Sequence, residues 1–213
     1  MLTLCALLFA TKTTAQEKWI DVTANYITNP NFNDGNYNGW VFYRQGYGNT
    51  SSPTLRAGVM ECWNDAFGLY QTISLPAGQY RLSANAFYRT KDNATAYSEY
   101  ANKTEDIKAY LYAGNENKVA LKSLYSSELS SNENGCWSTK VQGVTHYFAN
   151  SMETAGMVFE KGGLFNQIEF NHAGGDLQIG IYCDEWIQDC WCLWDNFKLG
   201  KRRSSPCSVT YPA

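Results

Sequence analysis

The sequence predicts an all-β protein, built as an antiparallel β-sandwich. Segments that alternate apolar and polar residues recur along the chain, and this period of two is typical of half-buried strands. Clusters of Gly, Asn, Asp and Pro separate these segments, as at 33–36, 76–78, 114–117 and 173–176. No stretch shows a sustained helical period with caps. Many short strands without alternating helices favour a sandwich over an α/β fold.

The longest alternating segments are 80–88, 107–113, 177–183 and 191–199. In the first, one face carries Tyr80, Leu82, Ala84, Ala86 and Tyr88, and the other carries Arg81, Ser83, Asn85, Phe87 and Arg89. In the last, we expect Trp191, Leu193, Phe197 and Leu199 to face away from Cys192, Trp194, Asn196 and Lys198. Shorter strands are expected at 40–44, 59–63, 69–75, 157–160 and 164–170, and single helical turns at 98–105 and 150–155.

Composition narrows the classes of function. The chain has 213 residues, of which 44% are hydrophobic and 17% charged, with a formal net charge of −3. This balance does not fit the basic surface of a nucleic-acid-binding protein. Two histidines leave little for a zinc site or a His-driven triad. The aromatic content of 15% exceeds what a core of this size needs, so we expect some rings on the surface.

The domain organisation is expected to be a leader, one domain and a tail. Residues 1–15 carry an apolar run and end in small residues, which predicts a signal peptide and hence a secreted or cell-surface protein. A buried N-terminal strand and a lipid anchor at Cys5 are the alternatives for this segment. Residues 16–200 form the predicted sandwich, and 201–213 a tail or linker to further domains. No other segment is apolar enough for a membrane span.

Several motifs resemble one family. Asn29-Pro30-Asn31-Phe32 followed by Gly39-Trp40 opens the chain, Leu69 to Ile73 with Leu75-Pro76-Ala77-Gly78 forms a hairpin, and Trp194 to Leu199 closes it. Their order resembles bacterial secreted carbohydrate-binding modules with the galactose-binding-like jelly-roll fold. The resemblance spans roughly residues 20–200. It implies a jelly roll that binds a polysaccharide or glycan without cleaving it.

Candidate ligand-binding residues combine rings with polar groups, because a sugar offers an apolar C–H face and a fringe of hydroxyls. One cluster is the outward face of central strands, with Asn85, Phe87, Arg89, Tyr110, Tyr112, Gln178 and Tyr182. The other lies in loops, with Glu61, Trp63, Asn64, Trp137 and Trp186. The alternative is that the tyrosines serve strand formation and the loop tryptophans close the end of the core.

The resemblance also implies a structural Ca²⁺ between the first and last strands. Asn31 and Asp195 stand at the matching motif positions, with Asp34 nearby. Calcium takes six to eight oxygen ligands. The alternative is that Asp195 only accepts a backbone hydrogen bond at its strand, so that the protein needs no cofactor.

Two further classes of function stay open. A glycoside hydrolase needs two carboxylates, ~5 Å apart for retention or ~6.5–9.5 Å apart for inversion, and no spacing here pairs them. The sequence therefore favours a non-enzyme. A structural or adhesion domain of a larger surface protein would bury its aromatic residues against a neighbour and show the same pattern.

Overall fold

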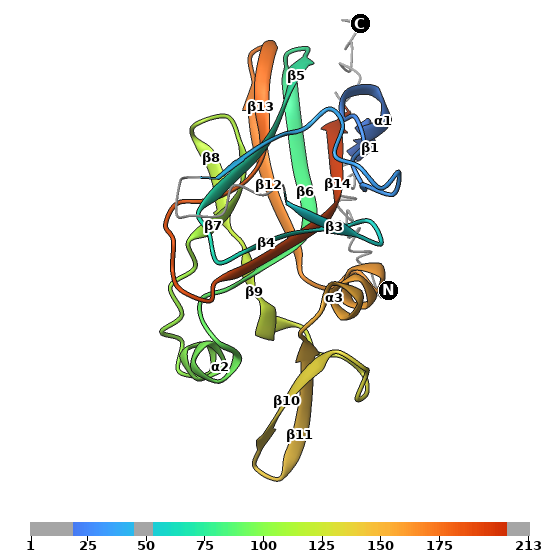
Figure 1. The fold of residues 1–213 in the computed structure, drawn as a ribbon. Coiled ribbons are helices and arrows are strands. Elements are labelled where there is room, and N and C mark those ends of the chain that lie inside the picture. The colour runs from blue at the N-terminus through green and yellow to red at the C-terminus, as the bar shows by residue number, and fades with distance from the viewer. Residues whose placement is uncertain (1–18, 45–52, 204–213) are drawn as a thin grey trace, which may run out of the picture.

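The computed structural model describes residues 19–44 and 53–203, and it confirms the antiparallel β-sandwich. The expected leader at 1–15, Cys5 and most of the expected tail lie outside the described residues. Figure 1 shows two larger sheets, and a separate hairpin that projects from one end of the sandwich. None of the helices described is long and apolar enough to cross a membrane.

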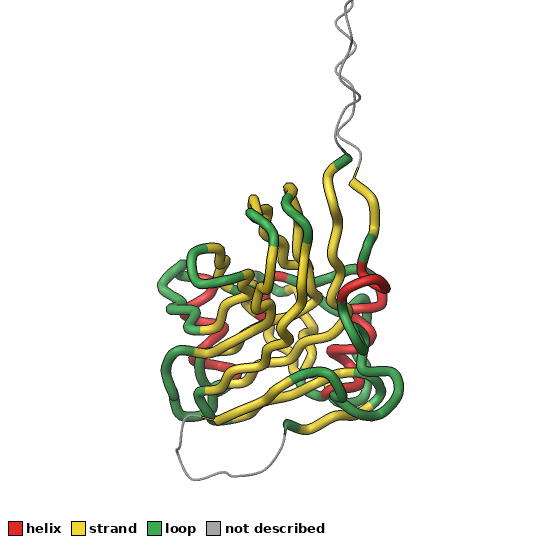
Figure 2. Tube along the Cα trace, turned by 90° about the horizontal axis from the view of Figure 1, so that it is seen from above, coloured by secondary structure: helices red, strands yellow, loops and turns green. Residues whose placement is uncertain are grey.

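Sheet A contains the longest strands. Its order is β12 (Phe165–His172), β6 (Gly78–Arg89), β14 (Trp191–Arg202), β4 (Val59–Trp63) and β3 (Thr54–Arg56). The short strands β1 (Trp19–Asp21) and β9 (Lys122–Ser123) pair with β14 and β6, the second of them in parallel. Because β1 pairs with the end of β14, the two described ends of the domain leave side by side (Figure 2). Lys201 and Arg202 therefore belong to a strand, not to a tail.

Sheet B packs against sheet A. Its order is β2 (Val41–Arg44), β5 (Phe67–Leu75), β13 (Gly175–Cys183), β7 (Ala109–Ala113) and β8 (Asn117–Ala120). Apolar residues of both sheets meet in the main core, where the ring of Trp194 from sheet A stacks on Phe67 from sheet B with centroids 5.0 Å apart. The thiols of Cys62, Cys183 and Cys192 are buried in this core.

A β-bulge changes the faces of β14. Its register with β6 shifts between Asp195 and Lys198. Before the bulge, Trp191 and Leu193 lie outside the main core and Trp194 lies inside it. After the bulge, Phe197 and Leu199 point inward, as expected from the sequence. The prediction that Trp191 and Leu193 share a face with Phe197 is therefore wrong, because the extra residue reverses the alternation.

Helices and a hairpin lie between β6 and β12, and the sequence analysis largely missed them. They are α2 (Asn93–Ala101), the 3-10 turn η1 (Leu124–Ser126), β10 (Cys136–Val141), β11 (Val144–Ala149) and α3 (Met152–Glu160). The four-residue helix α1 (Thr23–Tyr26) follows β1. The expected strand at 157–160 is wrong, since those residues end α3. The expectation of no capped helix is wrong as well, because Asp92 caps α2 and Ser151 caps α3.

This inserted region covers part of the outer face of sheet A. Phe87 and Leu193 from the sheet pack there against Phe159 of α3 and Phe148 of β11 in a second apolar core. In the view from above, strands form the centre of the molecule and most helical turns lie outside them (Figure 2). The cover is incomplete, and pockets remain on the outer face at both ends of it.

Candidate functional site

Three neighbouring strands of sheet A bring together an aromatic and cationic row. Trp191 of β14 lies opposite Trp63 of β4 on one side and opposite Arg89 of β6 on the other. Residues directly opposite in antiparallel strands share one face of the sheet. The row lines a pocket of about 320 Å³ together with Glu61, Asn150 and Ser151, which we call the tryptophan pocket.

The two indoles of the row have different surroundings. Trp63 is 50% exposed and presents its ring to solvent, whereas Trp191 is 5% exposed. The Nε1 atom of Trp191 donates a hydrogen bond of 2.6 Å to Oε1 of Glu61. The second carboxylate oxygen of Glu61 takes no part in this bond. The pocket therefore has the exposed ring of Trp63 next to the carboxylate of Glu61, which the buried Trp191 holds in place.

Arg89 forms another wall of the pocket. Its Cζ atom lies 5.1 Å from the centre of the Trp191 ring. Its terminal nitrogens donate to Oδ1 of Asn93 and of Asn150, at 3.1 and 3.3 Å, and to the carbonyl of Asp189 at 3.2 Å. Burial lowers the pKa of the Arg89 guanidinium from its ordinary value. Within the described residues it has no carboxylate at ion-pair distance, and its hydrogen bonds go to amide and carbonyl oxygens.

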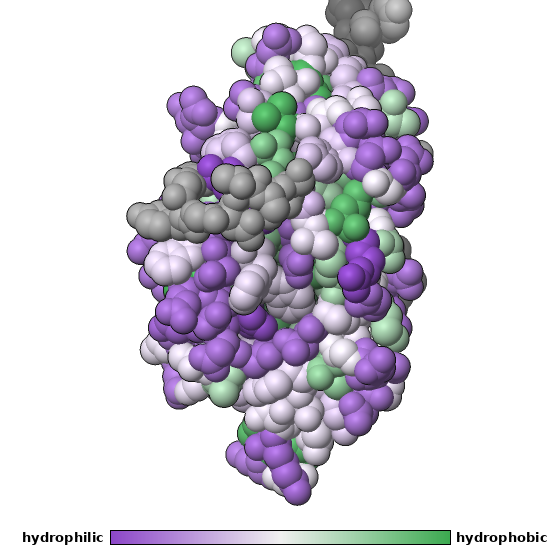
Figure 3. Space-filling model, viewed as in Figure 1, coloured by the Kyte–Doolittle hydropathy of each residue, from purple (hydrophilic) through white to green (hydrophobic). Residues whose placement is uncertain are grey.

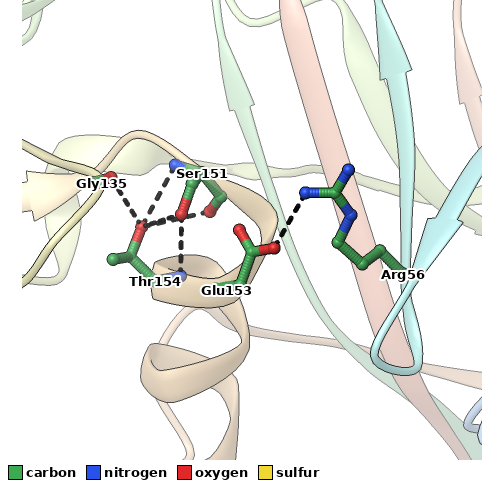
Figure 4. Close-up of polar contacts among 5 residues, drawn as sticks. All are labelled: Arg56, Gly135, Ser151, Glu153 and Thr154. Carbon is green, nitrogen blue, oxygen red and sulfur yellow. Dashed lines mark hydrogen bonds and ion pairs between the residues drawn. The ribbon is translucent and has the colours of Figure 1, made fainter.

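The start of α3 fixes the last wall. Ser151 and Thr154 form a capping box, and Oγ1 of Thr154 donates to the carbonyl of Gly135 at 3.1 Å (Figure 4). The backbone N–H of Asn150 donates to Oγ1 of Thr154 at 3.1 Å. An ion pair of 3.0 Å between Arg56 and Glu153 joins α3 to the β3–β4 turn (Figure 4). These bonds hold the Asn150 amide at the edge of the tryptophan pocket.

A second exposed indole lies beside the pocket. Trp186 is 37% exposed, and its Nε1 atom donates to the carbonyl and to Oδ1 of Asn64, at 3.0 and 3.2 Å. The same Oδ1 accepts a 2.9 Å bond from the backbone N–H of Asp189. Asn64 therefore ties the 184–190 loop to the end of β4, directly after Trp63.

A separate aromatic surface covers the outer face of sheet B. In one row, Tyr43, Gly68, Tyr182 and Tyr110 lie opposite one another across β2, β5, β13 and β7. In the next row, Tyr70, Gly180 and Tyr112 are opposite one another. We call these five tyrosines the tyrosine face. The glycines leave room for the rings, since a Cβ atom on Gly68 would clash with the ring of Tyr43.

The rings of the tyrosine face are in contact. The centroids of Tyr110 and Tyr182 are 5.3 Å apart in a stacked arrangement, and Tyr112 meets Tyr182 edge-on at 5.3 Å. Lys118 donates from Nζ to the Tyr182 hydroxyl at 2.9 Å. Burial raises the pKa of the Tyr112 hydroxyl, which stays neutral. A pocket of about 350 Å³ here is also lined by Tyr43, and its polar groups include those of Gln178 and Asp184.

The structure separates residues that the sequence analysis grouped. Arg89 lies on the outer face of sheet A, whereas Tyr110, Tyr112 and Tyr182 lie on the outer face of sheet B. They cannot line one cleft, because the main core lies between the sheets.

Other predicted residues serve packing. Phe87 is fully buried against Trp191. Asn85 is 7% exposed and donates to the carbonyl of Gly163. Trp137 of β10 packs against Tyr97, Tyr125 and Phe148, away from the tryptophan pocket.

The structure also adds residues that the sequence analysis did not choose. Asn150 and Trp191 line the tryptophan pocket, and Tyr43 and Tyr70 complete the tyrosine face. The sequence analysis missed Trp191 because alternation placed it on the face of Phe197 and Leu199, and the bulge that separates them left no signal in the sequence. No sequence signal marked Asn150, since its position depends on how α3 packs against sheet A.

The calcium site stays a prediction. The described part of the chain has no group of three or more His, Cys, Asp or Glu side chains arranged for a metal ion. Asp34 is exposed and Oδ1 of Asn31 accepts a long 3.4 Å bond from Asn33. Oδ1 of Asp195 accepts a 2.6 Å bond from the backbone of Asn196, and burial raises the pKa of this carboxyl to about 7. No hydrogen bond joins these three predicted ligands.

No protein-family model and no curated protein match this chain. Among solved structures, one that matches is described as TmCBM61 in complex with β-1,4-galactotriose. The likeness covers 83% of this chain and 97% of that chain, with 16% sequence identity and a TM-score of 0.42. A likeness at this level identifies no ligand for this chain. The function is therefore argued from the two surfaces described above.

Proposed function

We propose that the protein binds a glycan without cleaving it, and that the tryptophan pocket is the principal site. The observation that carries this proposal is the half-exposed ring of Trp63, which shares its pocket with the carboxylate of Glu61 and the guanidinium of Arg89. The indole suits the C–H face of a pyranose, and charged groups form the stronger hydrogen bonds to its hydroxyls.

The polar groups of the pocket offer both kinds of hydrogen bond. Glu61 accepts bonds, Arg89 donates them, and the Asn150 amide does both. Adjacent sugar hydroxyls are each donor and acceptor, so a pair of them fits between a carboxylate and a cation. The bonds that already hold these side chains reduce the entropy they lose on binding.

The tyrosine face is a second location for the same ligand class. Its five rings extend across four strands beside the pocket of about 350 Å³, and this breadth suits several consecutive sugars of an extended chain. Its polar groups, Lys118, Gln178 and Asp184, lie at the border of the rings. Export from the cell, which the leader predicts, would place both surfaces where polysaccharides occur.

The alternatives have less support from the described surfaces. Among the residues that line the tryptophan pocket, Glu61 is the one carboxylate, whereas glycoside hydrolysis uses two. A structural domain would offer a continuous apolar patch to its neighbour. The face seen in Figure 3 is mostly hydrophilic, and its apolar residues lie in separate small groups.

A glycan array of the purified domain tests the proposal, followed by calorimetry on the best ligand. For Trp63→Ala we expect Kd to rise about tenfold, because losing an aromatic contact of about 1–2 kcal/mol has that effect. Val144→Ala is the control, since this exposed residue lies on the hairpin, away from both surfaces. Melting temperatures of both variants should match the wild type.

Each outcome decides between the two surfaces. Weaker binding in Trp63→Ala alone supports the tryptophan pocket. Weaker binding in Tyr43→Ala alone moves the ligand to the tyrosine face. No retention of the wild type by any plant, fungal or host glycan rejects glycan binding.

A further inference from the structure

A third pocket lies on the outer face of sheet A, toward the other end of β6 and β14 from the tryptophan pocket. It measures about 330 Å³, and its side chains include Trp19, Arg81, Ser83, Phe165, Gln167 and Lys198. We call it the basic pocket. Neither candidate surface described above includes it.

Packing holds the Arg81 side chain in a defined position, and its N–H donors take no part in this. Its side chain passes over Gly200, where a Cβ atom would lie 3.0 Å from the Cγ and Nε atoms of Arg81. Its Cζ atom then stacks 4.9 Å from the ring centre of Trp19. Within the described chain, Arg81 forms no hydrogen bond or ion pair. Stacking occupies the face of the guanidinium and leaves its N–H edge for a planar anion.

Lys198 supplies a second cation in the same pocket. It lies opposite Ser83 in the pairing of β14 with β6, and it forms no ion pair among the residues described. Its charge helps to lower the pKa of Asp21, whose main stabilisation comes from the side chain and backbone of Thr23.

Two cations and one carboxylate line this pocket, namely Arg81, Lys198 and Asp21. Asp21 accepts two hydrogen bonds from Thr23, at 2.9 and 2.6 Å, and its charge offsets only one of the two cations. Glu169 lies opposite Arg81 in the pairing of β12 with β6, but no ion pair joins them because Arg81 turns toward Trp19. The lining therefore carries one positive charge in excess.

Arg202 adds positive charge near this pocket, although the whole chain has a net charge of −3. It lies opposite Trp19 in the pairing of β1 with β14, and it donates to Oε1 of Gln79 at 2.6 Å. Lys201 lies on the other face of the sheet, over the ring of Tyr80. A local basic region on an acidic chain attracts anions selectively. Phe165, 41% exposed, borders the pocket and gives an apolar surface beside the cations.

We propose that the basic pocket binds an anionic substituent of a sugar, a carboxylate or a sulfate ester. The N–H edge of Arg81 takes two oxygens of the anion, Lys198 contacts the anion from the adjacent strand, and the sugar ring packs on Phe165. The inference rests on the proposed function in one respect, that the ligand is a glycan. It adds that the glycan is acidic and that it is bound at a site separate from Trp63.

Calorimetry with three matched oligosaccharides tests this: an oligogalacturonate, its neutral galactose counterpart and a sulfated galactose oligomer. For Arg81→Gln we expect about tenfold weaker binding of the acidic ligands and unchanged binding of the neutral one. Arg81→Lys should give an intermediate loss, because it keeps the charge but not the two-point geometry. Lys140→Gln, on the hairpin, is the control. Acidic binding should also weaken as salt rises.

Equal binding of acidic ligands by the wild type and Arg81→Gln would overturn the inference, even if Trp63→Ala still weakened neutral binding. In that case the proposed function stands alone. Binding of inorganic sulfate as tight as that of the sulfated sugar would also overturn it, by showing an anion site without sugar recognition. A stronger response to the sulfated than to the carboxylated ligand identifies the sulfate ester as the substituent.

Discussion

Glu105 should make the protein more stable in mild acid than in mild base. It lies between α2 and β7, and its Oε1 atom is buried without a hydrogen-bond partner in the described part of the structure. The pKa of the Glu105 carboxyl is raised from 4.5 to about 7, chiefly by burial and to a smaller extent by the Glu99 carboxylate, while a hydrogen bond with Ser123 opposes both. The folded state therefore holds this proton more tightly than the unfolded state does.

The size of the effect follows from this pKa difference. Each pKa unit corresponds to about 1.4 kcal/mol, which sets a ceiling of about 3 kcal/mol for a shift from 4.5 to about 7. Partial exposure to solvent reduces the expected value to roughly 1–2 kcal/mol. The folded pKa is the higher one, so this stability is complete below pH 4.5 and is lost as the pH rises through 7.

The measurement is thermal unfolding of the wild type and Glu105→Gln between pH 4.5 and 8.5. Gln stays neutral at every pH. The Tm of the variant should therefore rise relative to that of the wild type as the pH rises, by about 2–8 °C at pH 8. Asp195, whose pKa burial also raises to about 7, is present in both proteins and cancels in the difference. A difference in Tm that stays constant with pH would refute the reasoning.

Two other predictions concern buried polar contacts. Trp191→Phe removes the donor to Glu61 and should lower the unfolding free energy by about 1.5–3 kcal/mol in urea titrations, whereas a zero coupling in the cycle with Glu61→Leu, which removes the acceptor, would contradict this. Arg44→Met breaks the buried 3.1 Å ion pair with Asp65 and should cost about 3–5 kcal/mol, partly recovered in Arg44→Met/Asp65→Asn. If Arg44→Met and Arg44→Met/Asp65→Asn have the same melting temperature, the unpaired Asp65 carboxylate is not the cause of the lost stability.

The strands were predictable because alternation is a local property. Strand β4 occupies Val59–Trp63 as expected, and β6 and β13 extend the expected segments by only a few residues at their ends. The helix α3 was not predictable in this way, because its end reads Met157-Val158-Phe159-Glu160 and resembles a short strand. The capping box at Ser151 and the docking of its apolar side on sheet A decide for a helix.

The candidate site was predictable only in its residue types. Trp63 and Glu61 alternate on one short strand, so their common face followed from the sequence. Arg89 joins them only through the order of strands in sheet A, and sequence alone does not determine this order. For the same reason Tyr110 was grouped with Arg89, although the two residues lie on opposite sides of the sandwich.

The bulge in β14 has a consequence for how this chain tolerates insertions and deletions. Between Asp195 and Lys198, β14 advances three residues while β6 advances two, from Asn85 to Ser83. Removing Asn196 would equalise the two counts and leave every later side chain on its present face. Removing a residue before the bulge, such as Leu193, would instead reverse the faces of the residues that follow it, with Lys198 toward the interior and Leu199 toward water. Asn196 therefore occupies the extra position of the β-bulge, and the rest of the strand keeps a regular alternation.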